Sequence, residues 1–495
     1  MNPTALRPAG HPGLPLAQLV PGADGVVRGV TLDSRGVRPG DLYVGLPGSR
    51  AHGAAFAADA RAAGALALLT DAAGAALAAG AGLPLLLADD PRAAMAEVAA
   101  DVYGRPGDHV ALFGVTGTNG KTSTVCLLEA ALAGLGRRVG TIGTLGFRVG
   151  GTPLVSSRTT ITTPESPDLQ ALLAVMRERG ADAVAMEVSS HALALHRVDG
   201  LTFEASAFTM LGQDHLEFHH TLEGYFAAKA RLFLGGRTRA AVVNTADPWG
   251  RRLAGLIAGE DAARLTTVHA GDADYRVLGS TPLPDGGWHV RLAHPAGETT
   301  FALSMLGAFN VANAVTALAL VGAAGCDVDA ASRALLPAQI PGRMQRVDLG
   351  EGAPYAVVDF AHTPQAVAAA LDALPRTGRR IAVLGAGGDR DATKRGPMGR
   401  AAAEHADIVV VTDDNPRSEE PAAIRAAVLA GAREAGGADA VDGGPRRDAI
   451  ARALRLARPG DWVAVLGKGH EAGQEIAGQT SPFDDVLVLR DVWGR

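Results

Sequence analysis

Residues 114–123 read GVTGTNGKTS and decide the fold class of this chain. An apolar run at residues 110–115, typical of a buried strand, leads into them, and a helical stretch at residues 122–135 follows. Glycines in such a loop allow backbone N–H groups to surround an anion, and the helix N-terminus adds a favourable dipole. Lys121 supplies positive charge, and the hydroxyl of Thr122 can reach Mg²⁺. The stretch therefore predicts a phosphate loop that binds a nucleoside triphosphate together with Mg²⁺.

The loop departs in one place from the strict pattern GxxxxGK[ST], because Val115 stands at the first glycine position. A glycine-rich turn with an unrelated lysine is the structural alternative. Even as a phosphate loop, the stretch does not identify the group that accepts the phosphate.

Length and charge limit the classes of partner. At roughly 150 residues per domain, 495 residues suggest three domains, with two or four as alternatives. The formal charge of −6 gives no general electrostatic surface for nucleic acid or an anionic membrane. No run of 18 apolar residues and no signal-like N-terminus is present, and two cysteines, Cys126 and Cys326, cannot form a disulfide framework. We therefore expect a cytoplasmic protein whose partners are small molecules, with no nucleic acid and no membrane.

Lysine is rare in this chain. Of its 46 basic residues only four are lysines, namely Lys121, Lys229, Lys394 and Lys468. Arginine and lysine differ in size and in how easily they lose a proton, so a lysine kept in such a background suggests a chemical requirement. Chance survival is the alternative for any single one of them.

Proline and glycine divide the chain into predicted domains. A Pro/Gly linker at residues 105–108 marks the first boundary, and Pro337, Pro341 and Gly342 mark the second. Between these boundaries strands alternate with helical stretches, as in a parallel sheet. We therefore expect an α/β protein with three domains, at residues 1–107, 108–340 and 341–495.

Three more apolar runs follow the second boundary, and each ends in a polar loop that contains glycine; they are residues 381–384, 408–411 and 463–466. Ligands of doubly wound sheets bind beyond the carboxyl ends of the strands, so these loops should converge on one pocket. GAGGDRDATKRG, at residues 385–396, lacks the third glycine of GxGxxG, which excludes a dinucleotide site. Arg390, Arg417 and Glu471 in these loops can together hold the carboxylates and ammonium of an amino acid.

Two further clusters suggest a metal site. Glu187, the first residue of EVSSHAL, lies at the end of a strand and is a candidate Mg²⁺ ligand, although a carboxylate that caps the next helix is the alternative. Residues 209–233 concentrate acidic residues and histidines, from which we single out His215, and they also contain Lys229. A zinc site would be possible by spacing, but no cysteine joins the cluster and a phosphate loop favours a hard cation.

Nine stretches, in this order across most of the chain, resemble the Mur ligase family: GTNGKT, EVSSHAL, DHLEFH followed by AAK, FNVANA, PGRM, DFAHTP, GGDRD, DNPR and GKGHE. The chain is most similar to the branch that makes UDP-N-acetylmuramoyl-tripeptides. The resemblance implies an N-terminal uridine-nucleotide domain, a central P-loop ATPase-like parallel sheet and a C-terminal Rossmann-like domain. It also implies a monomer that uses ATP and Mg²⁺ in peptidoglycan precursor synthesis. The γ-carboxylate of D-Glu in UDP-MurNAc-L-Ala-D-Glu would be phosphorylated, and the amine of an added diamino acid would then attack the acyl phosphate.

The resemblance also carries over site residues. Those implied to contact the substrates are Leu32, Ser34, Ser49, Arg50, Ala51, Thr162, Thr163, Ser189, Arg197, Arg390, Asp414, Asn415, Pro416, Arg417, Gly467 and Glu471. Those implied to contact ATP are Gly117, Thr118, Asn119, Gly120, Lys121, Thr122, Ser123, Asn310 and Arg343. Thr122, Glu187, His215 and Lys229 match Mg²⁺ positions, with Lys229 as a carbamate. Lys121, Lys229 and His215 match the catalytic positions.

Four residues depart from the family pattern in ways that bear on substrate contacts. Ile161 replaces a polar residue before a Thr-Thr pair, and Leu195 replaces a polar residue before His196. Met210 stands in place of an asparagine, and His52 in place of an aspartate.

Several alternatives stay open from the sequence. A folylpolyglutamate synthase shares the phosphate loop and the lysine, but the DNPR loop argues against it, and a non-catalytic binding subunit would not need Lys121, Glu187 and Lys229. The added amino acid is meso-diaminopimelate, L-lysine or L-ornithine. Arg417 in DNPR favours diaminopimelate because a guanidinium can grip its second carboxylate, unless Arg417 pairs with Glu419 or Glu420 instead.

Overall fold

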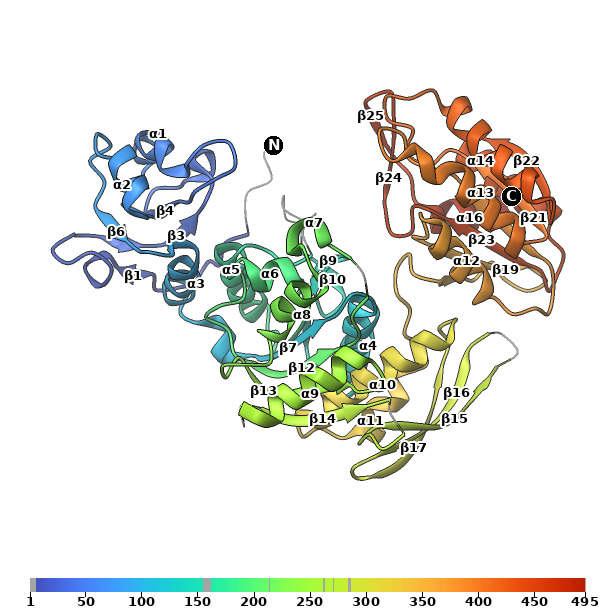
Figure 1. The fold of residues 1–495 in the computed structure, drawn as a ribbon, viewed down its shortest axis with the longest axis horizontal. Helices are drawn as coiled ribbons and strands as arrows, with labels where there is room; N and C mark the ends of the chain where they lie inside the picture. The colour runs from blue at the N-terminus through green and yellow to red at the C-terminus, as the bar shows by residue number, and fades with distance from the viewer. Residues whose placement is uncertain are drawn as a thin grey trace. The chain divides into compact units, whose positions relative to one another are not determined.

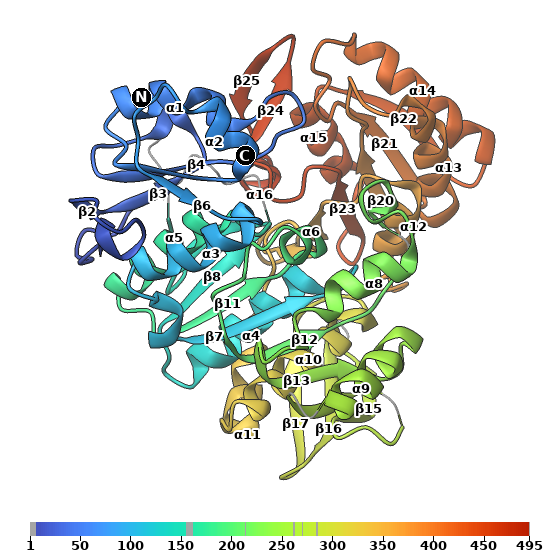
Figure 2. The ribbon, with the colours of Figure 1, turned by 60° about the vertical axis from the view of Figure 1, so that its left-hand side comes forward.

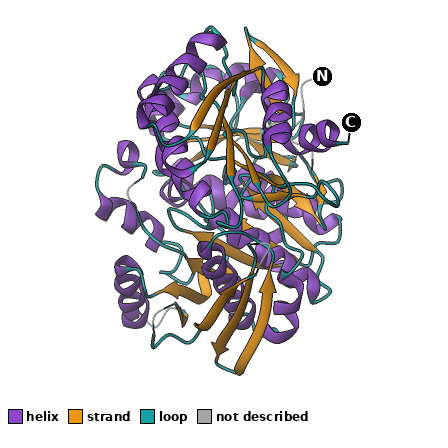
Figure 3. Cartoon of the chain, turned by 90° about the vertical axis from the view of Figure 1, so that its right-hand side faces the viewer, coloured by secondary structure: helices purple, strands orange, loops and turns teal. Residues whose placement is uncertain are grey.

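A computed structural model describes residues 6–154, 162–212, 214–260, 263–269, 271–283 and 286–494. The chain divides into two compact units (Figure 1), and strands alternate with helices in both (Figure 3). The first unit comprises Met1–Leu278, Arg291–Thr300 and Ala312–Leu335, and the second comprises Gly279–Val290, Phe301–Val311 and Leu336–Arg495. Ile161, one of the departures from the family pattern, lies outside the described residues.

The amino-terminal part of the first unit is built on a parallel sheet of order β3-β4-β5-β6. Its elements are β3 (Gly29–Thr31), β4 (Asp41–Gly45), β5 (Ala67–Thr70), β6 (Leu85–Leu87), α1 (Ala57–Ala62), α2 (Ala72–Leu77) and α3 (Pro91–Val102), preceded by the paired strands β1 (Leu14–Pro15) and β2 (Val26–Val27). Strand β4 is buried along its whole length, and the buried carboxylate of Asp41 pairs with Arg7. Because parallel strands end at one edge, the segments that follow β3 and β4 share an edge of this sheet.

The central sheet of the first unit has eight strands in the order β10-β9-β8-β11-β7-β12-β13-β14. Strands β8 to β14 of this order run parallel, and β9 and β10 form an antiparallel edge. The strands are β7 (Ala111–Thr116), β8 (Val139–Gly143), β9 (Gly146–Val149), β10 (Thr152–Pro153), β11 (Ala183–Glu187), β12 (Phe203–Phe208), β13 (Thr238–Asn244) and β14 (Arg264–Val268). Strand β7 lies between β11 and β12 (Figure 2). Val115 of β7 is paired with Glu187 of β11. The phosphate loop therefore leaves the same edge of the sheet as Glu187.

The helices around this sheet are α4 (Lys121–Gly134), α5 (Ser166–Glu178), α6 (Ser190–Ala194), α7 (Leu216–His219), α8 (Leu222–Ala230), α9 (Pro248–Glu260), α10 (Ala308–Ala323) and α11 (Val328–Ser332). A separate three-stranded sheet is formed by β15 (Arg276–Pro282), β16 (Trp288–His294) and β17 (Gly297–Leu303). Helix α4 starts directly after the phosphate loop and packs against β7, β8 and β11, which fixes the loop relative to the strands.

The second unit contains a six-stranded sheet of order β18-β19-β23-β20-β21-β22, in which only β18 is antiparallel. Its strands are β18 (Gln345–Val347), β19 (Tyr355–Asp359), β20 (Arg380–Leu384), β21 (Ile408–Thr412), β22 (Asp439–Gly444) and β23 (Trp462–Leu466). The other elements are α12 (Pro364–Asp372), α13 (Arg395–His405), α14 (Pro421–Ala435), α15 (Arg446–Leu456), α16 (Asp485–Trp493) and the hairpin β24 (Gly473–Ile476) and β25 (Gln479–Pro482). The three predicted apolar runs are β20, β21 and β23, which are neighbours in parallel register, so their loops leave one edge.

In the described part of the chain, no helix is both long enough and apolar enough to cross a bilayer.

A fully buried ion pair joins the last two helices of the second unit. Arg446 at the start of α15 donates from Nε and Nη2 to both carboxylate oxygens of Asp485 in α16, at 2.7 Å each, and both side chains are 0% exposed. The same guanidinium donates to the carbonyl of Leu466 at 3.0 Å, where β23 ends. The pair therefore ties the helices to the edge from which the loops leave.

We expect Asp485→Ala to destabilise the second unit by about 3–5 kcal/mol, because it leaves the Arg446 guanidinium buried without its counter-charge. Urea unfolding followed by hydrogen exchange of the β21 and β23 amides measures this loss. The control is Asp491→Ala, which removes the partner of Arg447 in an exposed pair between the same helices and should cost less than about 1 kcal/mol. Equal losses in the two variants would contradict the role given to the buried pair.

Candidate active site

The phosphate loop of the first unit connects β7 to α4. Gly117 has φ of +149°, and a Cβ at this position would lie 1.9 Å from Oγ1 of Thr209, so only glycine fits. Lys121 donates from Nζ to the carbonyls of Gly117 and Thr118, at 2.9 Å each. The lysine is thus folded over its own loop, where the charge lies beside the backbone N–H groups that can surround a phosphate.

Glu187 is the buried carboxylate beside this loop, with the residue only 1% exposed. The hydroxyl of Thr122 donates to Oε1 at 3.0 Å, and Thr144 donates its N–H to Oε1 at 2.8 Å and its hydroxyl to Oε2 at 3.2 Å. Burial raises the pKa of this carboxyl, while the hydrogen bond from the Thr144 N–H and the charge of Lys121 oppose the shift. The structure thus brings together Thr122 and Glu187, two of the predicted Mg²⁺ positions.

Thr144 was missed by the sequence analysis. It follows β8 and lies 43 residues before Glu187, in a stretch without acidic or basic residues that would draw attention to it. Its hydroxyl is also 3.4 Å from that of Thr162. Thr144 therefore links the buried carboxylate to a predicted substrate contact.

Lys229 projects from α8 into the same buried region and is 1% exposed. Its Nζ donates to the carbonyl of Gly117 at 2.9 Å and lies 4.5 Å from the ring centroid of Tyr225. Burial, followed by repulsion from Lys121, lowers the pKa of this amine well below the usual value of a lysine. Burial therefore favours the uncharged form of this amine, which is its nucleophilic form.

His215 lies at the start of α7 and its side chain is 43% exposed. Its ring packs edge-on against His191, with centroids 4.9 Å apart, and lies 6.2 Å from the ring of Tyr225 that Lys229 also approaches. His219 in the same helix is hydrogen-bonded through Nε2 to the Ser190 hydroxyl at 2.9 Å. Burial and the neighbouring His191 lower the pKa of His219 to about 4, so this ring is neutral near pH 7.

The predicted zinc alternative gains no support from the part of the chain that the structure describes. Within it, no group of three or more histidine, cysteine, aspartate and glutamate side chains has the geometry to hold a metal ion. By contrast, the hydroxyl of Thr122 and the carboxylate of Glu187 are oxygen donors of the type that Mg²⁺ takes, usually together with phosphate oxygens and water. The donors of this site therefore fit Mg²⁺.

The predicted contacts to the muramoyl-dipeptide lie beside Glu187. The hydroxyl of Thr163 donates to the backbone carbonyl of Glu187 at 2.9 Å and accepts from the N–H of Ser189 at 3.1 Å. Arg197 donates to the carbonyl of Thr163 at 3.0 Å and pairs with Glu165 at 2.8 Å. The structure therefore places these residues in one network with the phosphate-loop carboxylate.

Two of the departures from the family pattern have a structural explanation. His52 begins the short 3-10 helix Gly53–Phe56, and its Nδ1 accepts a hydrogen bond from the N–H of Ala54 at 3.1 Å, which is the capping role that an aspartate often fills. Met210 contacts the phosphate loop through its backbone, because its carbonyl accepts from the N–H of Thr118 at 2.8 Å. Leu195 directly follows α6, and no contact within the described residues explains why a leucine replaces a polar residue at this position.

The predicted uridine-nucleotide contacts lie after two adjacent strands of the amino-terminal sheet. Leu32 and Ser34 follow β3, and Ser49, Arg50 and Ala51 follow β4. The hydroxyl of Ser34 lies at the start of a 3-10 helix that Asp33 caps, and residues 49–51 are exposed. The two segments therefore leave one edge of this sheet.

In the second unit the predicted amino-acid loops contact one another. Asn415 donates from Nδ2 to Oε2 of Glu471 at 2.9 Å, which joins the loops after β21 and β23. Arg417 donates to the carbonyl of Gly388 at 2.8 Å, which joins the loops after β20 and β21. A Cβ at Gly467 (φ +112°) would lie 2.4 Å from Oδ2 of Asp414, so this glycine allows the two loops to approach closely.

The charges of this region are partly buried. Burial raises the pKa of Asp414, against the opposing charges of Arg446 and Lys468. Arg417 has φ of +54° and its Nε lies 3.5 Å from Glu475, whereas Glu419 is paired with Arg395 at 2.7 Å. Within the described residues Arg417 is thus paired with Glu475, and neither Glu419 nor Glu420 is its partner.

The remaining predicted residues of the second unit are Asn310, Arg343, Arg390 and Pro416. Asn310 is buried and donates to the carbonyl of Leu306 at 2.8 Å, and the guanidinium of Arg343 lies 4.9 Å from the ring centroid of Phe360. Arg390 is exposed, in the loop after β20.

Comparison with known proteins decides the family. Three models of the Mur ligase family match: the family's catalytic domain over residues 26–103, the middle domain over residues 115–321 and the glutamate ligase domain over residues 342–469. A UDP-N-acetylmuramoyl-L-alanyl-D-glutamate--2,6-diaminopimelate ligase from Streptomyces avermitilis is 48% identical, in an alignment that covers 98% of this chain and 97% of the relative. The chain belongs to the Mur ligase family.

Solved structures agree with this assignment. The structure of a UDP-N-acetylmuramoyl-L-alanyl-D-glutamate--2,6-diaminopimelate ligase is 31% identical and superposes with a TM-score of 0.73, covering 97% of this chain and 99% of that one. A Mycobacterium tuberculosis folylpolyglutamate synthase complexed with ADP and AMPPCP is 21% identical with a TM-score of 0.59 over 82% of this chain and 95% of that one, which shows a shared fold alone. The predicted fold class, α/β with three domains of the Mur ligase type, is confirmed.

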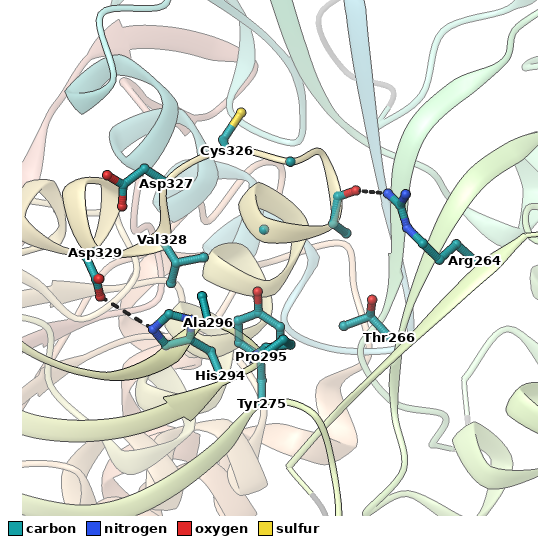
Figure 4. A pocket seen from close by; sticks show the side chains of 13 residues that line it. Arg264, Thr266, Tyr275, His294, Pro295, Ala296, Cys326, Asp327, Val328 and Asp329 are labelled. Atoms are coloured by element: carbon teal, nitrogen blue, oxygen red, sulfur yellow. Dashed lines mark hydrogen bonds and ion pairs between the residues drawn. The ribbon is translucent and has the colours of Figure 1, made fainter.

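A cavity of about 550 Å³ lies elsewhere in the first unit, between β14, β16 and the end of α10 (Figure 4). Arg264, Tyr275, His294, Cys326 and Asp329 are among its lining residues, and none of the predicted site residues belongs to the lining. His294 faces Asp329, with Nε2 3.4 Å from Oδ1. The cavity is thus separate from the phosphate loop and its network.

We expect Gly117→Ala to weaken ATP binding by at least about tenfold, because the new methyl group meets Thr209 and the backbone conformation disfavours any side chain. Isothermal calorimetry with a non-hydrolysable ATP analogue measures the affinity. Gly255→Ala in α9 is the matched control, since nothing lies within 4 Å of a Cβ there. A Gly117→Ala protein that binds the analogue as well as wild type would contradict the close packing of the loop.

Proposed function

We propose that this chain is an ATP-dependent ligase that joins 2,6-diaminopimelate to the D-Glu side-chain carboxylate of UDP-N-acetylmuramoyl-L-alanyl-D-glutamate, in peptidoglycan precursor synthesis. The observation that carries the proposal is the 48% identity, along nearly the whole of both chains, to a ligase named for this reaction. The connected network from the phosphate loop through Glu187 to Thr163 and Arg197 supports it.

The reaction has two steps. The γ-phosphoryl group of ATP passes to the D-Glu carboxylate, which gives an acyl phosphate and ADP, and the diaminopimelate amine then attacks the acyl carbon and releases phosphate. Such chemistry needs positioning and charge neutralisation more than a protein nucleophile. Lys121 offsets the negative charge of the transferring group, while Thr163, Ser189 and Arg197 hold the dipeptide end of the substrate.

Mg²⁺ would be held by Thr122, Glu187, His215 and a carbamate on Lys229. When bound, it would supply positive charge to the phosphate oxygens. The buried Glu187 carboxylate contributes fixed negative charge on one side, and the Thr122 hydroxyl orients toward it from the phosphate loop. The parallel pairing of β7 and β11 places the phosphate loop and Glu187 at the same sheet edge.

The burial of Lys229 supports a carbamate on its amine. A neutral amine attacks the carbon of CO₂ and loses one proton to solvent, which converts a cation into an anionic oxygen ligand. Burial and the nearby Lys121 favour the neutral amine. Arginine cannot take this route because its guanidinium stays protonated.

The other predicted properties remain proposals. Domain boundaries at residues 1–107, 108–340 and 341–495 are supported by the family matches at 26–103, 115–321 and 342–469. A nucleotide site that also includes Asn310 and Arg343, a uridine site at residues 32, 34 and 49–51, a monomeric state and a cytoplasmic location are predictions from the family resemblance. A folylpolyglutamate synthase is supported by fold alone, at 21% identity.

We expect Lys229→Ala to lose more than about a hundredfold in turnover, because it removes a ligand position for the cation that stabilises the transferring phosphate. Phosphate release measures turnover, and formate or acetate should partly restore it by standing in for the missing carboxylate. Lys229→Arg should be as inactive as Lys229→Ala without rescue. Wild-type turnover in Lys229→Arg would contradict the carbamate.

The choice of amino acid is tested by comparing meso-diaminopimelate, L-lysine and L-ornithine as the third substrate, with ATP and UDP-MurNAc-L-Ala-D-Glu held constant. We expect diaminopimelate to give the highest kcat/KM. Arg417→Ala should raise the diaminopimelate KM by about tenfold to a hundredfold, since a charge-assisted pair is worth roughly 1.5–3 kcal/mol, and should leave the ATP KM unchanged. Higher kcat/KM with lysine or ornithine would overturn the assignment of the amino acid but not that of the ligase.

A further inference from the structure

A fully buried lysine lies beneath the amino-acid loops of the second unit and takes no part in the function proposed above. The side chain of Lys468 is 0% exposed. Its ammonium donates to Oδ1 of Asn415 at 3.2 Å and to Oε2 of Glu471 at 3.2 Å. One ammonium therefore holds a side chain from the loop after β21 and another from the loop after β23.

These contacts fix which way the Asn415 amide faces. The N–H of Glu475 donates to the same Oδ1 at 3.0 Å, so two donors define the position of the amide oxygen. The amide nitrogen must then lie on the other side, where it donates to Oε2 of Glu471 at 2.9 Å. Lys468 and the Glu475 N–H together determine that Asn415 presents a donor, rather than an acceptor, to the glutamate.

The same contacts orient the Glu471 carboxylate. Within the described part of the chain, its side-chain hydrogen bonds from Lys468 and Asn415 both fall on Oε2. Oε1 is consequently the oxygen offered to a ligand, and a carboxylate oxygen is the natural acceptor for an ammonium group.

Stability alone does not account for this lysine. The Glu471 side chain is 38% exposed, so water can solvate this carboxylate without a buried partner. The buried charge that braces the fold here is Arg446, whose partner Asp485 is as buried as itself. What Lys468 adds is a fixed direction for two side chains of the predicted amino-acid pocket.

We infer that Lys468 is a positioning residue for the amino-acid substrate: it aligns Asn415 and Glu471 so that Oε1 of Glu471 receives an ammonium group of the incoming diamino acid. The inference rests on the proposed function, because it takes that ligand to be an amino acid. Lys468 would then be the third of the four lysines with a function, after Lys121 in the phosphate loop and Lys229 as the carbamate.

The test compares Lys468→Met, which keeps the length of the side chain and removes its charge, with wild type. We expect the diaminopimelate KM to rise by at least about tenfold, since the aligned charge-assisted contact is lost. The acyl-phosphate step, measured without amino acid by trapping with hydroxylamine, and the ATP KM should each change less than twofold. A purely structural defect would lower all of these together.

A matched control removes another buried cation of the same unit. The control variant is Arg380→Met. Arg380 lies at the amino end of β20, the end opposite the loops, and donates to the carbonyl of Leu374. The variant should lower the melting temperature without raising the diaminopimelate KM. A rise in KM comparable to that of Lys468→Met would overturn the inference.

A double-mutant cycle with Glu471→Gln separates positioning from other effects. If Lys468 acts through Glu471, then Lys468→Met in the Glu471→Gln background changes the diaminopimelate KM by less than about twofold. If the two substitutions raise the diaminopimelate KM independently, so that their fold-changes multiply, the inference is overturned. It is also overturned if Lys468→Met alone leaves this KM unchanged. Wild-type protein that forms no hydroxamate would overturn the proposed function and this inference with it, so the two failures are distinguishable.

Discussion

The buried carboxylate of Glu187 is the constraint on which the site of the first unit depends. An ionised carboxylate is costly to remove from water unless donors surround it, and here Thr122 at the start of α4 and Thr144 after β8 supply three hydrogen bonds. The same lack of water lowers the pKa of Lys229, 112 residues away from the loop carbonyl that it contacts. The charge of Lys121 acts on both groups: it opposes the raised pKa of Glu187 and helps to lower the pKa of Lys229.

The second unit uses buried charge in a different way. Arg446 and Lys468 are both fully buried, and each contacts segments that are distant in the sequence: α16 and the end of β23 for Arg446, the β21 loop for Lys468. Loops at a strand edge cannot be fixed by apolar packing alone, because their backbone groups must face polar partners or water. Directed hydrogen bonds from buried cations give these loops a defined shape while leaving their outer side chains for a ligand.

Sequence reasoning located the groups that carry charge and missed the groups that orient them. The phosphate loop, Glu187 and the loops after β20, β21 and β23 could be predicted because motif chemistry and the rule of strand ends place them at sheet edges. The role of Thr144 and the contact between Lys468 and Asn415 could not, since a hydroxyl or amide has no distinctive pattern and the two partners lie 43 and 53 residues apart. His52 was noticed as a departure, but only the structure shows its ring nitrogen capping a helix as an aspartate would.

The four lysines of this chain differ in what their positions require of the side chain. Lys229 is 1% exposed and Lys468 occupies a fully enclosed position between two acceptors, so a broad and permanently charged guanidinium suits neither place. The ammonium of Lys121 donates to the carbonyls of Gly117 and Thr118 in its own loop, and a compact ammonium can reach both of them. Lys394 is different, because it is partly exposed and, among the residues that the structure describes, its hydrogen bond goes to the carbonyl of His362, a contact that arginine could also make. Chemistry accounts for three of the four lysines, and chance survival is a sufficient explanation for the fourth.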